Sequence, residues 1–587
     1  MDIFSLKEEI KEKIRKAIFE NFGIEIKEIH LEYPPKMEMG DFAFPCFPLA
    51  KKLKKDPVQI ATELKEKIEK NEMIKEIKAQ GPYLNFFLNE ALIFEKFLKR
   101  IIQKEKEYGK SFEGKGKRVM IEYLSPNTNK PLHLGHLRNG ALGMALSNLF
   151  SLAGFKVIKA NLINDRGIHI SKSMLAWMKW GEGKTPKDTG EKGDHFVGRW
   201  YVKYSQEEKK NPDLKKEAQA LLQKWEKGDR KILKIWKKMR NWVLEGFEKT
   251  YKDFGLKFDV FIFESKIYKL GKKIVEEGLK KGIFSKDEKG RVVFYLEEKN
   301  QKDKKERKKI TLLREDGTSL YITQDLGTAL LKFKKYKLDK SIYVAGLEHD
   351  FYFKCLFSIL EALGFDFAKK CFHVSYGMVY LPEGKMKSRE GKVVDADDLI
   401  EKMKKMAEEE IQKRHKDKLK EKEIEKRAKA IGVGAIKFYL LRVDSREDIF
   451  FDPKESISFD GFTGPYCQYT FARSCGILKK AKAKGIKIKL DKIDFSKLGN
   501  QKEKKLLQYL LRFEEEIKRA REKLDPSKVA IHLYKICQAF NQFYNEYPVI
   551  SAEDLKVREA RLALVKATFV VLKKGLEILG ITPLEEM

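Results

Sequence analysis

Two histidines, His133 and His136, lie in the stretch of this chain whose residues are best suited to binding or catalysis. An apolar segment at 118–124 precedes them and predicts a buried strand, and from Gly135 onward apolar residues recur every four positions, which predicts a helix. Imidazoles at the start of a helix, beside free backbone N–H groups, can donate hydrogen bonds to phosphate oxygens. Gly135 would let a ligand approach the backbone closely. The segment therefore predicts a phosphate-binding turn.

Metal binding and helix capping are the alternatives for the same two histidines. A metal ion needs further ligands, and Glu122, Asp165 and His169 are those nearest in sequence. The order strand, turn, helix favours phosphate over metal.

A second segment, Lys385-Met-Lys-Ser-Arg389, is a basic loop bounded by glycines. Lysine charges and an arginine fork suit a polyphosphate. Lysine-rich loops are common in this chain, however, so alone the segment is better interpreted as a solvated loop.

The elements around these segments predict an α/β fold. A strand at 156–163 and a helix at 167–180 continue the pattern after the histidines, and strand, helix and strand recur at 341–345, 349–363 and 373–381. Such alternation predicts a right-handed, doubly wound parallel sheet with its ligand site at the carboxyl ends of the strands.

The rest of the chain predicts further domains, since 587 residues exceed one hydrophobic core. Helices near 6–18 and 58–68 and a strand at 83–88 predict a small α+β unit over 1–108, followed by a charged linker at 104–117. A Lys/Trp-rich helical insertion covers about 190–255. From 396 onward the pattern is mostly helical, with a basic loop at 479–505.

Charge and cysteine usage restrict the class of protein. Lys+Arg 122 against Asp+Glu 88 gives +34, which suits a nucleic-acid partner but is equally expected of a lysine-rich surface. Six cysteines lack zinc spacing and predict buried, reduced thiols with no structural metal. The first ten residues predict an amphipathic helix rather than a signal peptide, and no apolar run reaches the roughly 18 residues of a membrane span. We expect a cytoplasmic protein.

Considered together, the two segments resemble the two signatures of class I aminoacyl-tRNA synthetases, and further motifs resemble those of arginyl-tRNA synthetases. The resemblance extends over nearly the whole chain and includes the N-terminal unit. Its motifs are Ser125-Pro-Asn-Thr-Asn-Lys-Pro-Leu-His-Leu-Gly-His-Leu-Arg138, Gly193-Asp-His-Phe-Val-Gly-Arg-Trp-Tyr-Val-Lys203, Tyr321-Ile-Thr-Gln-Asp325, Thr463-Gly-Pro-Tyr-Cys-Gln-Tyr469, Gly580-Ile-Thr-Pro-Leu-Glu-Glu-Met587, Gly40-Asp-Phe-Ala43 and Gly81-Pro-Tyr-Leu-Asn-Phe86.

The resemblance implies adenylation of arginine by ATP with Mg²⁺, then transfer to the 3′ end of tRNA(Arg). It implies a tRNA-binding domain over 1–108, a Rossmann-like catalytic domain over 109–395, a helical linker over 396–448 and an all-α anticodon-binding domain over 449–587. We expect a monomer. The implied catalytic residues are Lys130, His133, Gly135, His136 and Lys385. The implied ATP-binding residues are Pro131, Leu132, Leu134, His349, Met386, Lys387, Ser388 and Arg389.

The second signature departs from the common Lys-Met-Ser-Lys-Ser form, because Lys387 is its third residue and Ser388 replaces the second lysine. In the family a lysine before the first signature compensates, and it matches Lys130. Lys387 or Arg389 is expected to assist.

The implied arginine site contains carboxylates, which are planar acceptors for a guanidinium. Without the resemblance, Tyr321 and Asp325 would be read as a capped strand end. The positions implied for arginine are Glu122, Ser125, Asn127, Tyr321 and Asp325. Those implied for tRNA are Tyr469, Arg473, Tyr544 and Met587, whose alternative is ordinary helix-bundle core.

Three other functions fit less well. A cysteine-specific synthetase would need zinc-type cysteine ligands, and a small nucleotidyltransferase would leave about 140 C-terminal residues without a role. A non-catalytic relative should lack His133, His136 or Lys385, and all three are present. No editing domain is expected, because a pocket of paired carboxylates rejects neutral analogues by binding alone.

Overall fold

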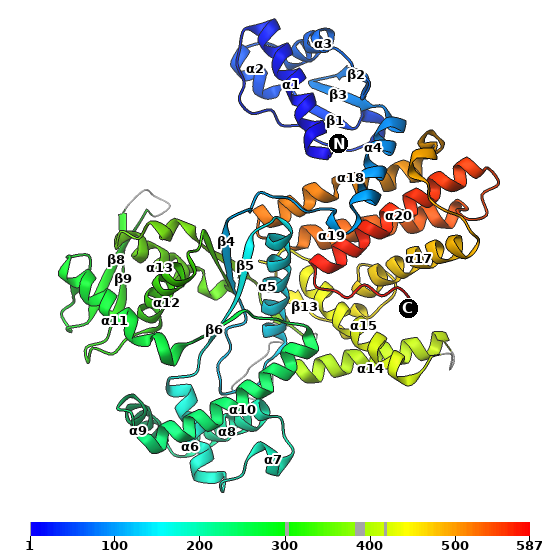
Figure 1. The fold of residues 1–587 in the computed structure, drawn as a ribbon. Coiled ribbons are helices and arrows are strands. Elements are labelled where there is room, and N and C mark those ends of the chain that lie inside the picture. Colours follow the sequence, from blue (N-terminus) through cyan, green and yellow to red (C-terminus); the bar gives the residue numbers. More distant parts are fainter. Residues whose placement is uncertain (1, 300–304, 382–393, 416–418) are drawn as a thin grey trace.

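The computed structural model describes residues 2–299, 305–381, 394–415 and 419–587. In Figure 1 a small N-terminal domain lies at one end, a sheet with flanking helices lies in the middle, and a group of long C-terminal helices packs beside it. The predicted fold class is confirmed: a parallel-sheet domain with an N-terminal α+β unit and a helical C-terminal part.

The central sheet has five parallel strands in the order β11-β10-β4-β5-β6. Its neighbours β4 and β10 are far apart in sequence, so the strand order reverses beside β4, where ligands bind in doubly wound folds. The strands are β4 (Arg118–Glu122), β5 (Lys156–Ile163), β6 (Val260–Phe263), β10 (Lys340–Gly346) and β11 (Cys371–Tyr376).

Two details of the sheet differ from the sequence prediction. The edge strand β6 was not predicted, because four residues are too few for a periodic signal. The strand predicted at 373–381 was wrong in its second half. The chain leaves the sheet after Tyr376, and β12 (Val379–Tyr380) pairs with β13 (Ile449–Phe450) instead.

Residues 123–133, between β4 and α5, form the histidine turn. Helix α5 (Leu134–Leu152) follows it and is buried between the sheet and the C-terminal helices (Figure 1). Its glycines allow this position, since a Cβ on Gly143 would lie 2.2 Å from Cγ of Tyr123. Arg138 of α5 is fully buried and donates to four backbone carbonyls, including those of Gly377 and Ser445 at 2.7 and 2.9 Å. It thereby ties the end of the sheet to the C-terminal part of the chain.

Two insertions interrupt the central domain. The helical insertion predicted near 190–255 lies between β5 and β6. A second insertion, not predicted, forms a three-stranded antiparallel sheet between α11 and α12. The elements are α6 (Ile168–Trp180), α7 (Pro186–Thr189), α8 (Gly193–Lys210), α9 (Leu214–Glu226), α10 (Arg230–Phe254), α11 (Glu264–Lys280), β7 (Ser285–Lys286), β8 (Val292–Lys299), β9 (Lys305–Leu313) and α12 (Tyr321–Tyr336).

The N-terminal domain packs its helices on a three-stranded antiparallel sheet of order β1-β3-β2. Within the charged linker predicted at 104–117, Tyr108 is buried and stacks on Phe513 of α18 (Gln501–Glu522), so part of this segment packs on the C-terminal helices. The elements are α1 (Ile3–Phe22), β1 (Phe42–Pro45), α2 (Phe47–Leu53), α3 (Pro57–Lys67), β2 (Ile74–Gln80), β3 (Tyr83–Leu88) and α4 (Glu90–Lys104).

The C-terminal part is helical, as predicted, but the basic loop predicted at 479–505 is shorter. Helix α17 continues to Ala483 and α18 begins at Gln501. None of the described helices is long and apolar enough to cross a membrane, and all six cysteines are buried and outside any disulfide. The helices are α13 (Asp350–Ala362), which flanks the central sheet, and α14 (Ala396–His415), α15 (Glu421–Leu441), α16 (Pro453–Ser456), α17 (Gly464–Ala483), α18 (Gln501–Glu522), α19 (Ser527–Glu546) and α20 (Leu555–Ile578).

Candidate active site

The turn between β4 and α5 has an unusual backbone. Leu124 and Ser125 have φ values of 78° and 45°, a region that costs about 1–3 kcal/mol for a residue with a side chain. Asn139 of α5 compensates, since its Oδ1 accepts from the N–H of Leu124 at 2.5 Å and its Nδ2 donates to the carbonyl of Val344 at 2.9 Å. The following residues pair with the end of β5 through an Asn127–Asn164 bridge. Helix α5 and strands β5 and β10 thus hold the turn in place at the switch point, where the strand order reverses beside β4.

His133 and His136 meet at the first turn of α5, with ring centroids 3.9 Å apart. The backbone N–H of His133 donates to Nδ1 of His136 at 3.2 Å. In neutral His136 the proton is therefore on Nε2, which remains available as a donor. A Cβ on Gly135 would lie 3.1 Å from Cε1 of His133, so this glycine makes room for the imidazole.

Both histidines are held neutral. Burial, with the nearby charge of Lys130, lowers the pKa of His133 to about 3. Burial also holds the pKa of His136 well below its usual range, and His133 and Lys130 add to the effect. Neutral imidazoles donate hydrogen bonds without adding charge, so positive charge in this turn comes from lysine.

The metal alternative for these histidines gains no support from the described residues. Asp165 is fully buried and accepts from the N–H and hydroxyl of Ser265 at 2.9 and 2.8 Å. Among the described residues, only Asp194, His195 and Asp397 form a group of three with metal-ligating atoms close together, and it does not include His133 or His136.

A second group of side chains lies at the start of α12, beside the carboxyl end of β4. Asp325 accepts a hydrogen bond from the hydroxyl of Tyr352. The pKa of Asp325 is raised to about 6, mainly by burial and in smaller part by the charge of Glu122. Tyr321, one turn before Asp325, is 57% exposed, so it lies at the open side of this group.

Glu264, the first residue of α11, belongs to the same group and was not predicted. Burial raises its pKa to about 8, and the charges of Asp325 and Asp165 act in the same direction. With its amide oriented to satisfy both neighbours, Gln324 donates to Glu264 and accepts from Nη1 of Arg166 at 3.0 Å. The local signal for Glu264 was its place at the carboxyl end of a short apolar run, as Glu122 ends β4, but four residues are too few to mark that run as a strand.

Glu122 itself is paired. Nζ of Lys332, on α12, lies 2.6 Å from its Oε2, and both side chains are almost fully buried. The ammonium also lies 4.2 Å from the ring centroid of Tyr343. Glu122, Asp325 and Glu264 therefore form an acidic group in which one carboxylate already has a fixed cation.

The other predicted positions are arranged around these two groups. Pro131 packs on α8, and Leu132 and Leu134 are buried. The ring centroid of His349 is 6.3 Å from that of Tyr352, so His349 lies beside the acidic group. The second-signature positions lie outside the described residues; they are Lys385, Met386, Lys387, Ser388 and Arg389.

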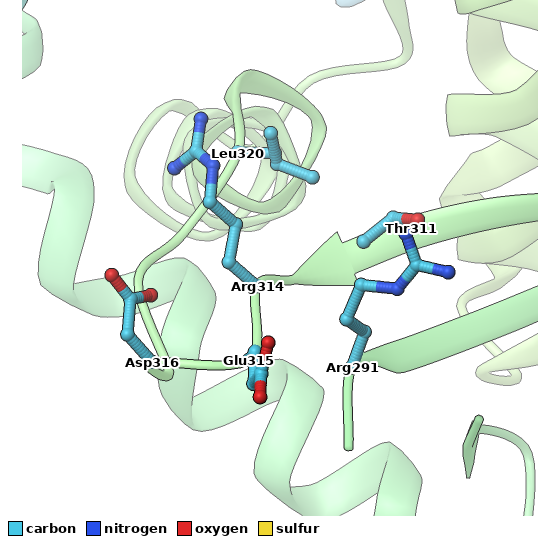
Figure 2. A pocket seen from close by; sticks show the side chains of 6 residues that line it. All are labelled: Arg291, Thr311, Arg314, Glu315, Asp316 and Leu320. Atoms are coloured by element: carbon cyan, nitrogen blue, oxygen red, sulfur yellow. The ribbon is translucent and has the colours of Figure 1, made fainter. Parts of the chain in front are cut away.

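A hollow of about 740 Å³ lies on the β7–β9 insertion and is shown in Figure 2. Its arginines already have partners, since Arg291 is paired with Asp287 at 2.7 Å and Arg314 donates to Thr318 at 3.1 Å. It contains none of the predicted site residues, and it is not the candidate site.

In the C-terminal helices, Arg473 joins two of the predicted positions. Its guanidinium lies 4.9 Å from the ring centroid of Tyr469 and 5.8 Å from that of Tyr544. It donates to Oδ1 of Asn541 at 2.7 Å and to the Tyr469 hydroxyl at 3.2 Å. Met587 is half-buried and packs on the hydrophobic core that the central domain shares with the C-terminal helices. The half-buried cluster of α17 and α19 thus presents two aromatic rings beside one fixed cation.

The strand–turn–helix with two histidines, at the carboxyl ends of a parallel sheet, defines the class to which the central domain belongs. Residues 97–452 match the family model described as the catalytic domain of class I (R) tRNA synthetases. Residues 5–88 match the arginyl tRNA synthetase N-terminal domain, and residues 467–587 match the DALR anticodon binding domain.

Full-length relatives agree. An arginine–tRNA ligase of Treponema denticola is 45% identical over 571 residues, covering 96% of this chain and 95% of its own. One of Bacteroides thetaiotaomicron is 42% identical, covering 95% and 96%. The structure of Thermus thermophilus arginyl-tRNA synthetase is 26% identical with a TM-score of 0.83, covering 99% and 100%. The chain belongs to the arginyl-tRNA synthetase family.

Proposed function

We propose that this protein is an arginine–tRNA ligase that activates L-arginine with MgATP and transfers it to the 3′ end of tRNA(Arg). The observation that carries the proposal is the acidic group of Asp325 and Glu264 at the switch point, next to the turn with two neutral histidines. It combines acceptors for a guanidinium with donors for phosphate. Family membership and full-length relatives of this activity support the same reaction.

The guanidinium of arginine is assigned to Asp325 and Glu264, with Tyr321 at the opening. A planar guanidinium donates to two carboxylates along its edges. The raised pKa values of both carboxyls follow from their burial together, and a bound cation would relieve this cost. Tyr352 orients Asp325 through its hydroxyl.

The α-amino and carboxylate end of arginine is assigned to Glu122, Ser125 and Asn127. All three belong to the end of β4 or its turn, which several hydrogen bonds hold in place. Lys332 neutralises the charge of Glu122, so that this buried carboxylate is not left unpaired in the site.

ATP is assigned to the turn that begins α5. His133 and His136 would donate to its phosphates as neutral groups, while Lys130 and Lys385 supply the positive charge, with Lys387 or Arg389 assisting. Pro131, Leu132, Gly135, Leu134, Met386, Ser388 and His349 complete the proposed contacts. The arginine carboxylate attacks the α-phosphorus and pyrophosphate leaves. No general base is needed, since the nucleophile is already ionised, and catalysis relies on positioning and charge neutralisation.

The tRNA is assigned to the C-terminal helices, with Tyr469, Arg473, Tyr544 and Met587 near the anticodon. Aromatic rings beside a fixed guanidinium suit unstacked bases. The net charge of +34 suits the phosphate backbone. We further propose that the protein acts as a monomer in the cytoplasm, where tRNA is charged for translation.

ATP–pyrophosphate exchange with each amino acid, with and without tRNA, tests the proposal. We expect exchange with arginine in the presence of tRNA, and none with His136→Ala. Exchange supported only by another amino acid would contradict the assignment.

A further inference from the structure

Helix α8 of the insertion contacts the histidine turn directly through Gly198 and indirectly through Asp395. Gly198 lies against Pro131, where a Cβ would come within 2.6 Å of the proline Cδ. One turn earlier on α8, His195 reaches Asp395, a residue that forms a β-bridge with His133. The insertion therefore supports the turn directly.

His195 lies between two carboxylates. Its Nε2 is 3.1 Å from Oδ2 of Asp395 and 3.3 Å from Oδ2 of Asp397. The other oxygen of Asp395 caps α14, since it accepts from the backbone N–H groups of Asp397 and Asp398 at 2.8 and 3.2 Å. Asp395 thus joins the start of α14 to α8, and the imidazole is the group that holds it there.

Lys192 adds a second cation to this group. Its Nζ lies 2.5 Å from Oδ2 of Asp397, 3.2 Å from Oδ2 of the buried Asp194 and 2.6 Å from the hydroxyl of Thr250 on α10. Thr250 in turn donates to Oδ1 of Asp397 at 2.8 Å. Asp194, His195 and Asp397 could by distance hold a divalent cation. The ammonium of Lys192 already contacts two of these carboxylates, so the group is an ion-pair cluster.

The segment that His195 holds is paired with the first signature. The N–H of Leu134 donates to the carbonyl of Val394, and the N–H of Ala396 donates to the carbonyl of Leu132, both at 3.0 Å. Val394 directly follows the stretch 382–393, which carries the second-signature residues in the sequence. The backbone that brackets His133 is therefore bonded to the backbone where that stretch ends.

We propose that His195 is a positioning residue for the activation step. By holding Asp395 and Asp397, it keeps residues 394–396 paired with Leu132–Leu134. It thereby fixes the positions of His133 and of Val394, which follows the second-signature stretch. His195 contacts no reacting group in this scheme. The inference rests on the proposed function, and it concerns the ATP side of the site rather than the arginine side.

The test compares three variants with a matched control. His195→Ala removes the imidazole, His195→Gln removes its charge, and Asp395→Asn removes its partner without changing the size of the side chain. The control is Lys172→Met. It removes an ion pair between α6 and α8, to Glu208 at 2.9 Å, whose side chains are 18% and 17% exposed, and Glu208 follows His195 by 13 residues on α8.

Two measurements are made on each full-length variant: arginine-dependent ATP–pyrophosphate exchange in the presence of tRNA, and the Kd of MgATP by calorimetry. For His195→Ala we expect a tenfold or larger loss in kcat/KM for ATP and a weaker MgATP Kd, with the KM for arginine within twofold. His195→Gln and Asp395→Asn should show smaller losses of the same pattern, and Lys172→Met should stay within twofold throughout.

Each outcome decides the inference. If His195→Ala fails to fold, the pattern in His195→Gln and Asp395→Asn decides it. Wild-type kinetics and MgATP Kd in those two variants would overturn it, as would an equal loss in Lys172→Met or a rise in the arginine KM as large as that for ATP. A stoichiometric bound metal in the purified protein would also overturn it. A wild-type protein without arginine exchange would contradict the proposed function, and the MgATP Kd would still test His195.

Discussion

Nζ of Lys332 lies 2.6 Å from Oε2 of Glu122, and the two side chains are 1% and 8% exposed. They join α12, which carries Asp325, to the end of β4, from which the histidine turn begins. A buried ion pair adds little over an apolar pair, but removal of one partner leaves an uncompensated charge.

Lys332→Met should therefore destabilise the protein by about 3 kcal/mol, the low end for a broken buried pair. Urea unfolding followed by tryptophan fluorescence measures this loss. The KM for arginine should rise while that for ATP changes little, since we propose that Glu122 contacts the arginine. Lys332→Arg keeps a cation and should retain most of the stability. Unchanged unfolding in Lys332→Met would show that the pair is not the support that its burial suggests.

Arginine binding should strengthen as the pH rises. In the free site the pKa of Asp325 is raised to about 6 and that of Glu264 to about 8, mainly by burial. A guanidinium binds the ionised carboxylates, so below each pKa a proton must first leave, at a cost of tenfold in affinity per pH unit. The KM for arginine should fall between pH 6 and pH 8.5.

The variant Glu264→Gln tests which carboxyl is responsible. It should remove the inflection near pH 8 and leave the one near pH 6, with a higher KM at pH 8.5. The KM for ATP, measured in the same assays, is the internal control and should show neither inflection. A pH profile that is the same in Glu264→Gln and the wild type would exclude Glu264 from the guanidinium site.

Citrulline, which replaces the guanidinium by a neutral urea, should be rejected by binding alone. It would leave the Asp325 and Glu264 carboxylates with too few donors, and sites built on hydrogen bonds reject such analogues by about 10⁴-fold. Exchange with citrulline and arginine at equal concentrations gives the ratio of kcat/KM values. Discrimination below about 100-fold would mean that these carboxylates do not contact the side chain of the substrate.

The strand, turn and helix from β4 to α5 could be predicted from the sequence because the signals there are local. An apolar run, a polar turn and a four-residue spacing adjoin one another in the chain. The short strand β6 gave no such signal, and Glu264 was missed with it. Its position became visible only when β6 was found at the edge of the sheet beside β5.

Long-range pairs explain the rest of what sequence reasoning missed. Lys332 is one lysine of a lysine-rich helix, and nothing local distinguishes it from its solvated neighbours. Its buried position depends on Glu122 of β4, which lies 210 residues earlier in the chain. His195 and Asp395 are likewise 200 residues apart, and only the packing of α8 against the histidine turn brings them together.

The stabilising effect of His195 should depend on pH. Its close contacts with the carboxylates of Asp395 and Asp397 raise its pKa to about 10, compared with about 6.5 in the unfolded chain. A raised pKa stabilises the fold fully below the unfolded value, and the effect is lost as the pH rises through the folded value. The groups that face it are Lys192, Asp194, Thr250, Asp395 and Asp397.

The difference in Tm between the wild type and His195→Gln should therefore be largest near pH 6 and shrink steadily toward pH 10. Thermal melts of both proteins across this range measure it, and the difference removes contributions from groups that both share. The difference for Lys172→Met should stay flat over the same range. A difference for His195→Gln that grows with pH would mean that His195 is neutral in the folded protein.

Arg473→Ala should weaken tRNA use without affecting activation of the amino acid. The guanidinium lies beside the rings of Tyr469 and Tyr544, and its loss removes both a cation and the fixed position of Tyr469. Loss of a stacked base costs about 1–3 kcal/mol, so kcat/KM for tRNA should fall at least fivefold, while the KM values for arginine and ATP at saturating tRNA should stay within twofold.

Arg519→Ala on α18 is the control, because Arg519 is 61% exposed and pairs only weakly with Glu516 at 3.6 Å. Equal losses in the two variants would attribute the effect to net charge alone, since a specific contact requires the aromatic neighbours that Arg473 has.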